Sequence, residues 1–196
     1  YQIEALLAEM APEFGPDTVV ISVAAGISIA RLQAAVAGRC PVVRCMPNTP
    51  ALVGKGVFAL CFDDKVPAES KEDILRFFSQ LGVCLELPES RFTAFSALIG
   101  AGPAYVFGMM QGLVQAGVTL GLGRKDCRDM VAALFEGSAV MAARSDTPLM
   151  ELRDQVCSPG GLTIAGVNVL DRVGLSGLLV DAVLAADERG REMEKE

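Results

Sequence analysis

The stretch SPGGLT, at residues 158–163, holds the residue types in this chain that are best suited to chemistry. We expect Ser158 to cap a helix that runs from about Leu162, with Pro159 at its start, because proline lacks the N–H that is unpaired there anyway. The glycine pair carries no Cβ, so a ligand could approach its backbone closely. Free N–H groups and the positive helix end would then bind a small anion. An ordinary helix cap with a flexible glycine pair explains the same residues, because caps far outnumber ligand sites.

The composition excludes several classes of function. The length of 196 residues suits one large domain or two small ones, and the apolar share of 52% suits a well-buried core. The net charge of -7 argues against nucleic acid or an anionic membrane as the main partner. We expect no transmembrane segment and no signal peptide, because no apolar run has the required length. The count of zero histidines excludes Ser-His and Cys-His catalytic pairs and a histidine metal site, so we expect no metal.

The cysteines predict a reducing compartment. There are six, none forms a CxxC pair, and most lie within apolar runs. They are typical of small buried hydrophobic residues, so we expect a cytoplasmic protein.

The first half of the chain predicts alternating strands and helices. Runs rich in β-branched residues predict strands buried on both faces at 18–24 and 41–46, and two more strands follow at 57–62 and 83–87. Helical patterns occupy residues 1–10, 28–36 and 70–81. This alternation predicts a doubly wound parallel sheet, in which ligands bind at the carboxyl ends of the strands. Ala25 and Met46 to Thr49 occupy such ends, although ordinary strand-ending turns explain either one alone.

The second half predicts helices throughout, at about 91–98, 103–120, 124–144, 148–157, 162–173 and 175–194. The helix at 103–120 is apolar on nearly all sides, so it must be buried on all sides. The segment Gly100-Ala101-Gly102 resembles the start of a dinucleotide fingerprint, but Tyr105 stands where the third glycine belongs. We therefore expect a glycine-rich loop that leads into the helix.

Five motifs, taken in chain order, resemble those of the pyrroline-5-carboxylate reductases: VAAGI, VVRCMPNTPALVGKG, SALIGAGPAYVF, GLGR and, above all, DQVCSPGGLTIAGVNVLD. The resemblance covers the whole chain and implies an α/β part followed by an all-α part. Residues 1–90 would form the C-terminal part of a Rossmann-like nucleotide-binding domain, and residues 91–196 a helical substrate-binding and dimerisation domain. The family's Gly-rich first strand–helix unit, which cradles the cofactor's pyrophosphate, is not among these residues. We therefore expect a polypeptide limited to them not to bind the cofactor normally.

The resemblance also implies a reaction, which is reduction of 1-pyrroline-5-carboxylate to L-proline by hydride transfer from NADPH, or sometimes NADH. This is the last step of proline biosynthesis. A protonated imine is already electrophilic, so the protein must mainly hold two planar groups together and exclude water. The implied substrate contacts are Ser158, Gly160, Gly161, Leu162, Thr163 and Asp146. Thr163 is the implied catalytic residue, with its hydroxyl at the ring nitrogen, and Ala25, Met46 and Asn48 would border the nicotinamide and its ribose.

Asp146 stands where the family often has a glutamate, and an exposed residue in a helix–helix turn explains it as well.

Two other functions stay open. The chain could be a non-catalytic oligomerisation fragment or a degenerate binding protein. It could also be a related dehydrogenase with another substrate, although these usually place a catalytic lysine or histidine in the helical part, which here holds only Lys125 and Lys195. The family's subunits interlock through these helices and share active sites, which implies a homodimer or larger homo-oligomer and neither a nucleic acid nor a membrane partner.

Overall fold

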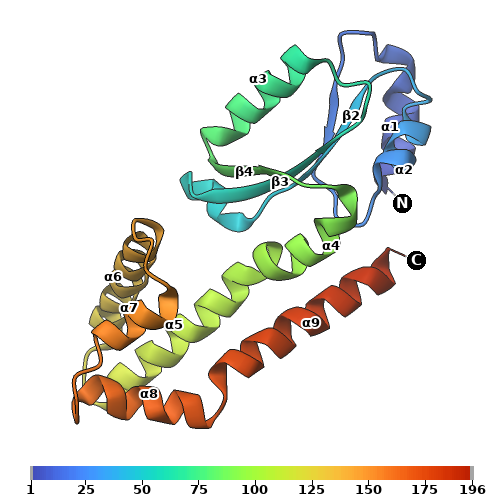
Figure 1. The fold of residues 1–196 in the computed structure, drawn as a ribbon. Helices are drawn as coiled ribbons and strands as arrows, with labels where there is room; N and C mark the ends of the chain where they lie inside the picture. The colour runs from blue at the N-terminus through green and yellow to red at the C-terminus, as the bar shows by residue number, and fades with distance from the viewer. Residues whose placement is uncertain (1, 195–196) are drawn as a thin grey trace. The chain divides into compact units, whose positions relative to one another are not determined.

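The computed structural model describes residues 2–194, which form two compact units (Figure 1). Of these residues, the first unit comprises 2–103 together with 183–194, and the second comprises 104–182.

A four-stranded sheet forms the centre of the first unit, with the strands in the order β1 (Val20–Ser22), β2 (Val42–Met46), β3 (Gly56–Phe62) and β4 (Gly82–Glu86). The pairs β1–β2 and β3–β4 are parallel, but β2 and β3 are antiparallel, with Val43 opposite Phe62. The expectation of an all-parallel sheet is therefore wrong at this pair. The connection, residues 47–55, is shorter than the roughly dozen or more residues that a parallel crossover needs.

Helices cover both faces of this sheet (Figure 1). Val43 and Cys45 of β2 pack in one cluster with Phe78 of α3 (Ala68–Ser79). Val42, on the opposite face, packs in a cluster with α1 (Gln2–Met10) and α2 (Ile29–Ala35). The same face of β3 contributes Ala59, which packs against α4 (Phe92–Phe95). The central strands are therefore buried on both sides, as the β-branched run at 41–46 predicts.

Strand β1 differs from its prediction. It has only three residues, and Ile21 and Val23 are 37% and 59% exposed, so the expected burial of 18–24 on both faces is wrong. The reason is position, because β1 lies at the edge of the sheet and pairs with β2 alone. The helix that follows is capped by Ser28, whose hydroxyl accepts a hydrogen bond from the Arg31 N–H at 3.2 Å.

The predicted helices of the second half are confirmed as α5 (Gly102–Thr119), α6 (Arg124–Ala143), α7 (Leu149–Gln155), α8 (Leu162–Arg172) and α9 (Leu175–Met193). The short π-helix η4 (Ser96–Gly100) joins α4 to α5, so the expectation of a loop at 100–102 is wrong. The helical run from Glu89 to Thr119 has 31 residues, and an 18-residue stretch within it has a mean hydropathy of 1.4, so by length and composition alone it could cross a membrane. The expectation that no apolar segment has that length is therefore also wrong. Glycine and glutamine residues interrupt the apolar positions of this run, so it does not stand out in the sequence as a continuous apolar segment.

Candidate active site

The turn between α7 and α8 contains the predicted substrate residues. Gly161 is the N-cap of α8, with φ -81° and ψ 178°, and no side chain caps this end. The Ser158 carbonyl accepts a hydrogen bond from the Gly161 N–H at 3.0 Å. The prediction that Ser158 caps the helix, with Pro159 in its first turn, is therefore wrong. Gly160, at φ +66°, redirects the chain between these residues and the helix.

Each glycine of the pair suits the geometry of the turn. Gly160 occupies the left-handed region, which costs other residues roughly 1–2 kcal/mol. A Cβ on Gly161 would lie 3.2 Å from the Ser158 carbonyl oxygen and 3.3 Å from the Ser158 Cβ. The pair therefore fixes the direction in which α8 begins.

The start of α8 presents unpaired donors to solvent. The first N–H groups of an α-helix have no acceptor within the helix, and here they belong to Leu162, Thr163 and Ile164. Leu162 is 95% exposed, and Thr163 at the second helical position is also exposed. These donors, together with the positive end of an eleven-residue helix, can bind a small carboxylate.

An ion pair fixes α7 against α8 on either side of this turn. The Arg153 guanidinium lies 3.3 Å from an Asp171 carboxylate oxygen and 3.0 Å from Asp154. The hydrogen bond to Asp154 is the main cause that raises the pKa of Arg153. Sequence reasoning missed this pair, although Arg153 directly precedes the motif at 154–171 that carries the family resemblance and Asp171 is the last residue of that motif.

Asp146 lies in the exposed loop between α6 and α7. In the part of the chain that the structure describes, its carboxylate makes no hydrogen bond or ion pair with residues 158–163. The structure therefore keeps Asp146 in the same compact unit as the turn without joining the two directly.

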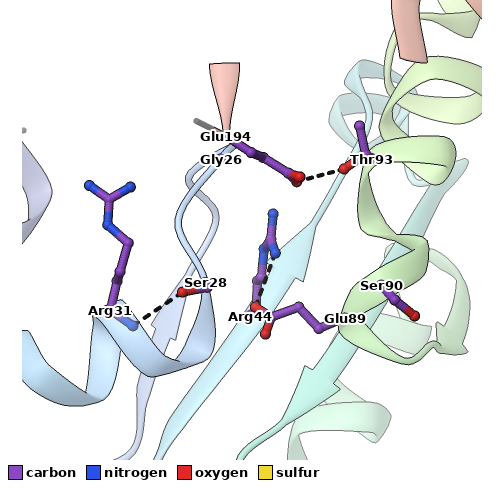
Figure 2. Close-up of a pocket in the computed structure, with 8 residues that line it drawn as sticks. All are labelled: Gly26, Ser28, Arg31, Arg44, Glu89, Ser90, Thr93 and Glu194. Atoms are coloured by element: carbon purple, nitrogen blue, oxygen red, sulfur yellow. Dashed lines mark hydrogen bonds and ion pairs between the residues drawn. The ribbon is translucent and has the colours of Figure 1, made fainter. Parts of the chain in front are cut away.

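The predicted cofactor residues lie in the first unit, and Ala25 belongs to the loop of residues 24–28 that follows β1. Ala25 and Gly26 line a cavity of about 570 Å³, and Gly26 also lines a second cavity of about 350 Å³ (Figure 2). Gly26 has φ +75°, with open space where a Cβ would be. Ala25 is exposed and Gly26 has no side chain, so this part of the loop fits the flat ring of a nicotinamide.

Met46 is the last residue of β2, Asn48 lies just after it, and both are engaged within the unit. The Asn48 Oδ1 accepts a hydrogen bond from the Val57 N–H at 2.9 Å, and its Nδ2 donates to the Ile99 carbonyl at 3.3 Å. The Met46 Cε lies 3.3 Å from the position that a Cβ on Gly100 would take. Neither residue lines the two cavities beside Ala25.

The smaller cavity also contains Arg44 and Glu89, two residues that sequence reasoning missed. Arg44 is only 6% exposed although it is charged. A single arginine within a strand predicted to be buried was the available signal. Burial of the neighbouring residue, Cys45, raises the pKa of its thiol to about 12. Among residues 2–194, no group of three or more cysteines and carboxylates could hold a metal ion.

Comparison with known proteins shows similarity along the whole chain. The family model described as pyrroline-5-carboxylate reductase dimerisation matches residues 89–193. The pyrroline-5-carboxylate reductase of Corynebacterium melassecola is 40% identical over 178 residues, which cover 91% of this chain and 66% of that protein. The Pseudomonas aeruginosa enzyme is 37% identical over 192 residues, which cover 97% of this chain and 70% of that protein. The chain thus spans about two thirds of the length of these relatives.

Solved structures give the same result. The Plasmodium falciparum pyrroline carboxylate reductase with NADP bound superposes with a TM-score of 0.90 at 32% identity, covering 98% of this chain and 77% of that one. The pyrroline-5-carboxylate reductase of Coxiella burnetii superposes with a TM-score of 0.89 at 30% identity, covering 98% and 72%.

Proposed function

The chain belongs to the pyrroline-5-carboxylate reductase family, and on this premise we propose that the protein containing it reduces 1-pyrroline-5-carboxylate to L-proline with a reduced nicotinamide dinucleotide. The observation that carries the proposal is the start of α8, where unpaired N–H groups lie next to the Thr163 hydroxyl. This arrangement suits a small ring that bears a carboxylate and a protonated nitrogen.

In the proposed reaction the residues of the α7–α8 turn bind and orient the substrate. The N–H groups at the start of α8 donate to its carboxylate, and the Gly161 N–H instead holds the turn closed through Ser158. The Thr163 hydroxyl hydrogen-bonds the ring nitrogen and helps to hold its proton. Asp146, on a neighbouring loop, adds negative charge that stabilises the iminium. Ser158 and the glycine pair set the position of these groups.

On the cofactor side, the nicotinamide supplies a hydride when it is bound. Ala25 would border the ring, and its small side chain allows close approach. Asn48 would act indirectly, because its Oδ1 and its Nδ2 both form hydrogen bonds within the chain that fix the segment after β2. We assign NADPH ahead of NADH, supported by the NADP bound to the Plasmodium falciparum structure.

The proposal includes the assembly and the setting of the protein. Residues 1–90 form the cofactor part and residues 91–196 the part that binds substrate and a second copy. A homodimer or larger homo-oligomer is supported by the dimerisation model and by the apolar surface of the helical unit. The apolar run at 89–119 then contacts protein rather than lipid, and nucleic acid has no role. The six free cysteines support a cytoplasmic location.

Oxidation of NADPH that depends on 1-pyrroline-5-carboxylate tests the function, with L-proline identified by mass spectrometry. We expect one proline for each NADPH consumed. Binding of NADPH without any proline formed would instead indicate a non-catalytic protein or another substrate.

A further inference from the structure

One face of β2, the face that carries Val42, has a single charge between two apolar residues. Val42 and Met46 join apolar clusters on this face, and Arg44 lies between them in the strand. The Arg44 guanidinium lies over the Phe92 ring, 4.6 Å from its centroid, and is 3.0 Å from Glu89. A buried charge costs free energy unless it is paired and hydrogen-bonded, so this pair requires a reason.

The Glu89 carboxylate has a second partner that is far away in sequence. Its Oε1 accepts a hydrogen bond from the Ile29 N–H at 2.7 Å as well as the bond from Arg44 (Figure 2 draws the ion pair). Ile29 is the first residue of α2 and directly follows the loop of residues 24–28. One carboxylate oxygen thus joins the end of this loop to the central strand β2.

The loop of residues 24–28 is held at a few points, and one of them is Ile27, which is buried in the core cluster that includes Leu32 and Val42. At its start, the Ala24 N–H donates to the buried Ser22 hydroxyl at 3.3 Å. At its end, Ser28 caps its own helix and Ile29 donates to Glu89. Ala25, which is exposed, and Gly26, at φ +75°, lie between the Ser22 contact and Ile27. Their placement therefore depends on the two ends of the loop and on the packing of Ile27.

We propose that Glu89 is a positioning residue for the cofactor, which holds the 24–28 loop through the Ile29 N–H while Arg44 holds the carboxylate in place. The part that concerns the cofactor rests on the proposed function, whereas the part that concerns the loop does not. Arg44 is the anchor because it is buried, and Glu89 is the link because its side chain reaches the cavity edge, where it is 34% exposed.

Amide hydrogen exchange of the protein without cofactor tests the link. Glu89→Ala should speed exchange within residues 24–30 on the order of tenfold or more, because it removes a hydrogen bond to a charged acceptor. Glu89→Gln keeps an oxygen acceptor and should have a smaller effect. The double variant Arg44→Met/Glu89→Ala leaves no buried charge unpaired and should show the same fast exchange. Residues 56–62 of the core strand serve as the internal reference.

Glu86→Gln is the matched control, because Glu86 pairs with Lys71 at 2.6 Å in the same unit. It should leave exchange in 24–30 unchanged. Unchanged exchange in this segment for both Glu89→Ala and the double variant would overturn the proposal. An equal rise in residues 56–62 would overturn it as well, since that indicates global destabilisation alone.

Steady-state kinetics test the role toward the cofactor. Glu89→Ala should raise the KM for NADPH by about threefold or more with a smaller change in kcat, and Glu89→Gln should raise it less, whereas a loss of folded enzyme alone would leave KM unchanged. An unchanged KM for NADPH beside faster loop exchange would overturn the cofactor role. If the wild-type protein reduces no pyrroline-5-carboxylate, the proposed function fails, and the exchange result still decides the role of Glu89 in the loop.

Discussion

At the scale of single residues, Thr163 is the side chain whose removal should affect the chemistry most directly. Thr163→Ala removes one hydrogen bond to a group whose charge changes in the reaction, a loss of roughly 1.5–3 kcal/mol. We expect kcat/KM to fall on the order of tenfold to a hundredfold. The fold should be unaffected, because Thr163 is exposed and does not cap α8. Initial rates with pyrroline-5-carboxylate and the thermal unfolding midpoint provide the measurements.

Thr163→Ser is the control for this substitution, because it keeps the hydroxyl and removes only a methyl group. It should retain most of the activity. If Thr163→Ala keeps a normal kcat/KM, the hydroxyl has no role at the ring nitrogen.

Gly160 allows the geometry of the turn to be separated from general stability. Gly160 and Gly174 both have left-handed backbones, at φ +66° and +71°, and both have open space where a Cβ would be. Alanine at either position should therefore cost a similar amount, roughly 1–2 kcal/mol. Only Gly160→Ala should also raise the KM for pyrroline-5-carboxylate, because Gly174 lies in the turn after α8. Equal KM values in the two variants would show that the 158–163 turn does not bind the substrate.

The sequence revealed this turn but not its internal geometry. Residue types at 158–163 predict a helix start with free donors, and α8 does begin at Leu162. They do not predict which residue caps it, because Ser158 and Gly161 are both acceptable N-caps. That choice depends on the left-handed conformation of Gly160 and on the close contact of Gly161 with Ser158.

At the scale of elements, Asn48 joins three segments of the first unit. Its amide links the end of β2 to the start of β3 at Val57 and to η4 at Ile99. Asn48→Ala should lower the free energy of unfolding by about 1–3 kcal/mol, since it leaves the Val57 N–H without its acceptor. Urea unfolding followed by circular dichroism would measure this loss. Asn168→Ala, at an exposed position in α8, should change stability by less than about 0.5 kcal/mol. Equal stability of the two variants would contradict the structural role of Asn48.

Positions of elements were more predictable than their pairing. Apolar periodicity along the chain predicts where strands and helices lie, and the four strands fall within or close to the predicted ranges. The direction of β3 depends on the connection at 47–55, where η2 (Thr49–Val53) replaces a crossover helix. The exposure of β1 depends on which strands surround it, and a run of β-branched residues does not contain that information. The Arg44–Glu89 contact joins residues 45 positions apart, so local patterns could not predict it.

At the scale of the whole molecule, the second unit exposes too much apolar surface for a stable monomer. Only Val114 and Cys127 are buried among its described apolar residues. Large side chains such as Phe107, Met141 and Leu162 are more than half exposed. Contiguous apolar surface above several hundred Å² marks a protein interface in soluble proteins. Folding and dimerisation should therefore be coupled, with a Tm that rises with protein concentration.

Gly112 in α5 distinguishes a dimer from a monomer by the sign of a stability change. Within one chain, a Cβ on Gly112 would meet nothing within 4 Å. In a monomer, Gly112→Leu should therefore raise stability, by up to roughly 1 kcal/mol, because leucine forms helix more readily than glycine. In a dimer packed closely through α5, the larger side chain should lower stability by roughly 1–3 kcal/mol through overpacking. We expect this loss of stability, together with weaker self-association in sedimentation equilibrium at low micromolar concentration.

Gly15→Leu, at an equally open position in the first unit, is the control and should leave the association constant unchanged. A folded monomer of the wild-type protein at that concentration, or a gain in stability from Gly112→Leu, would falsify the dimer packed through α5.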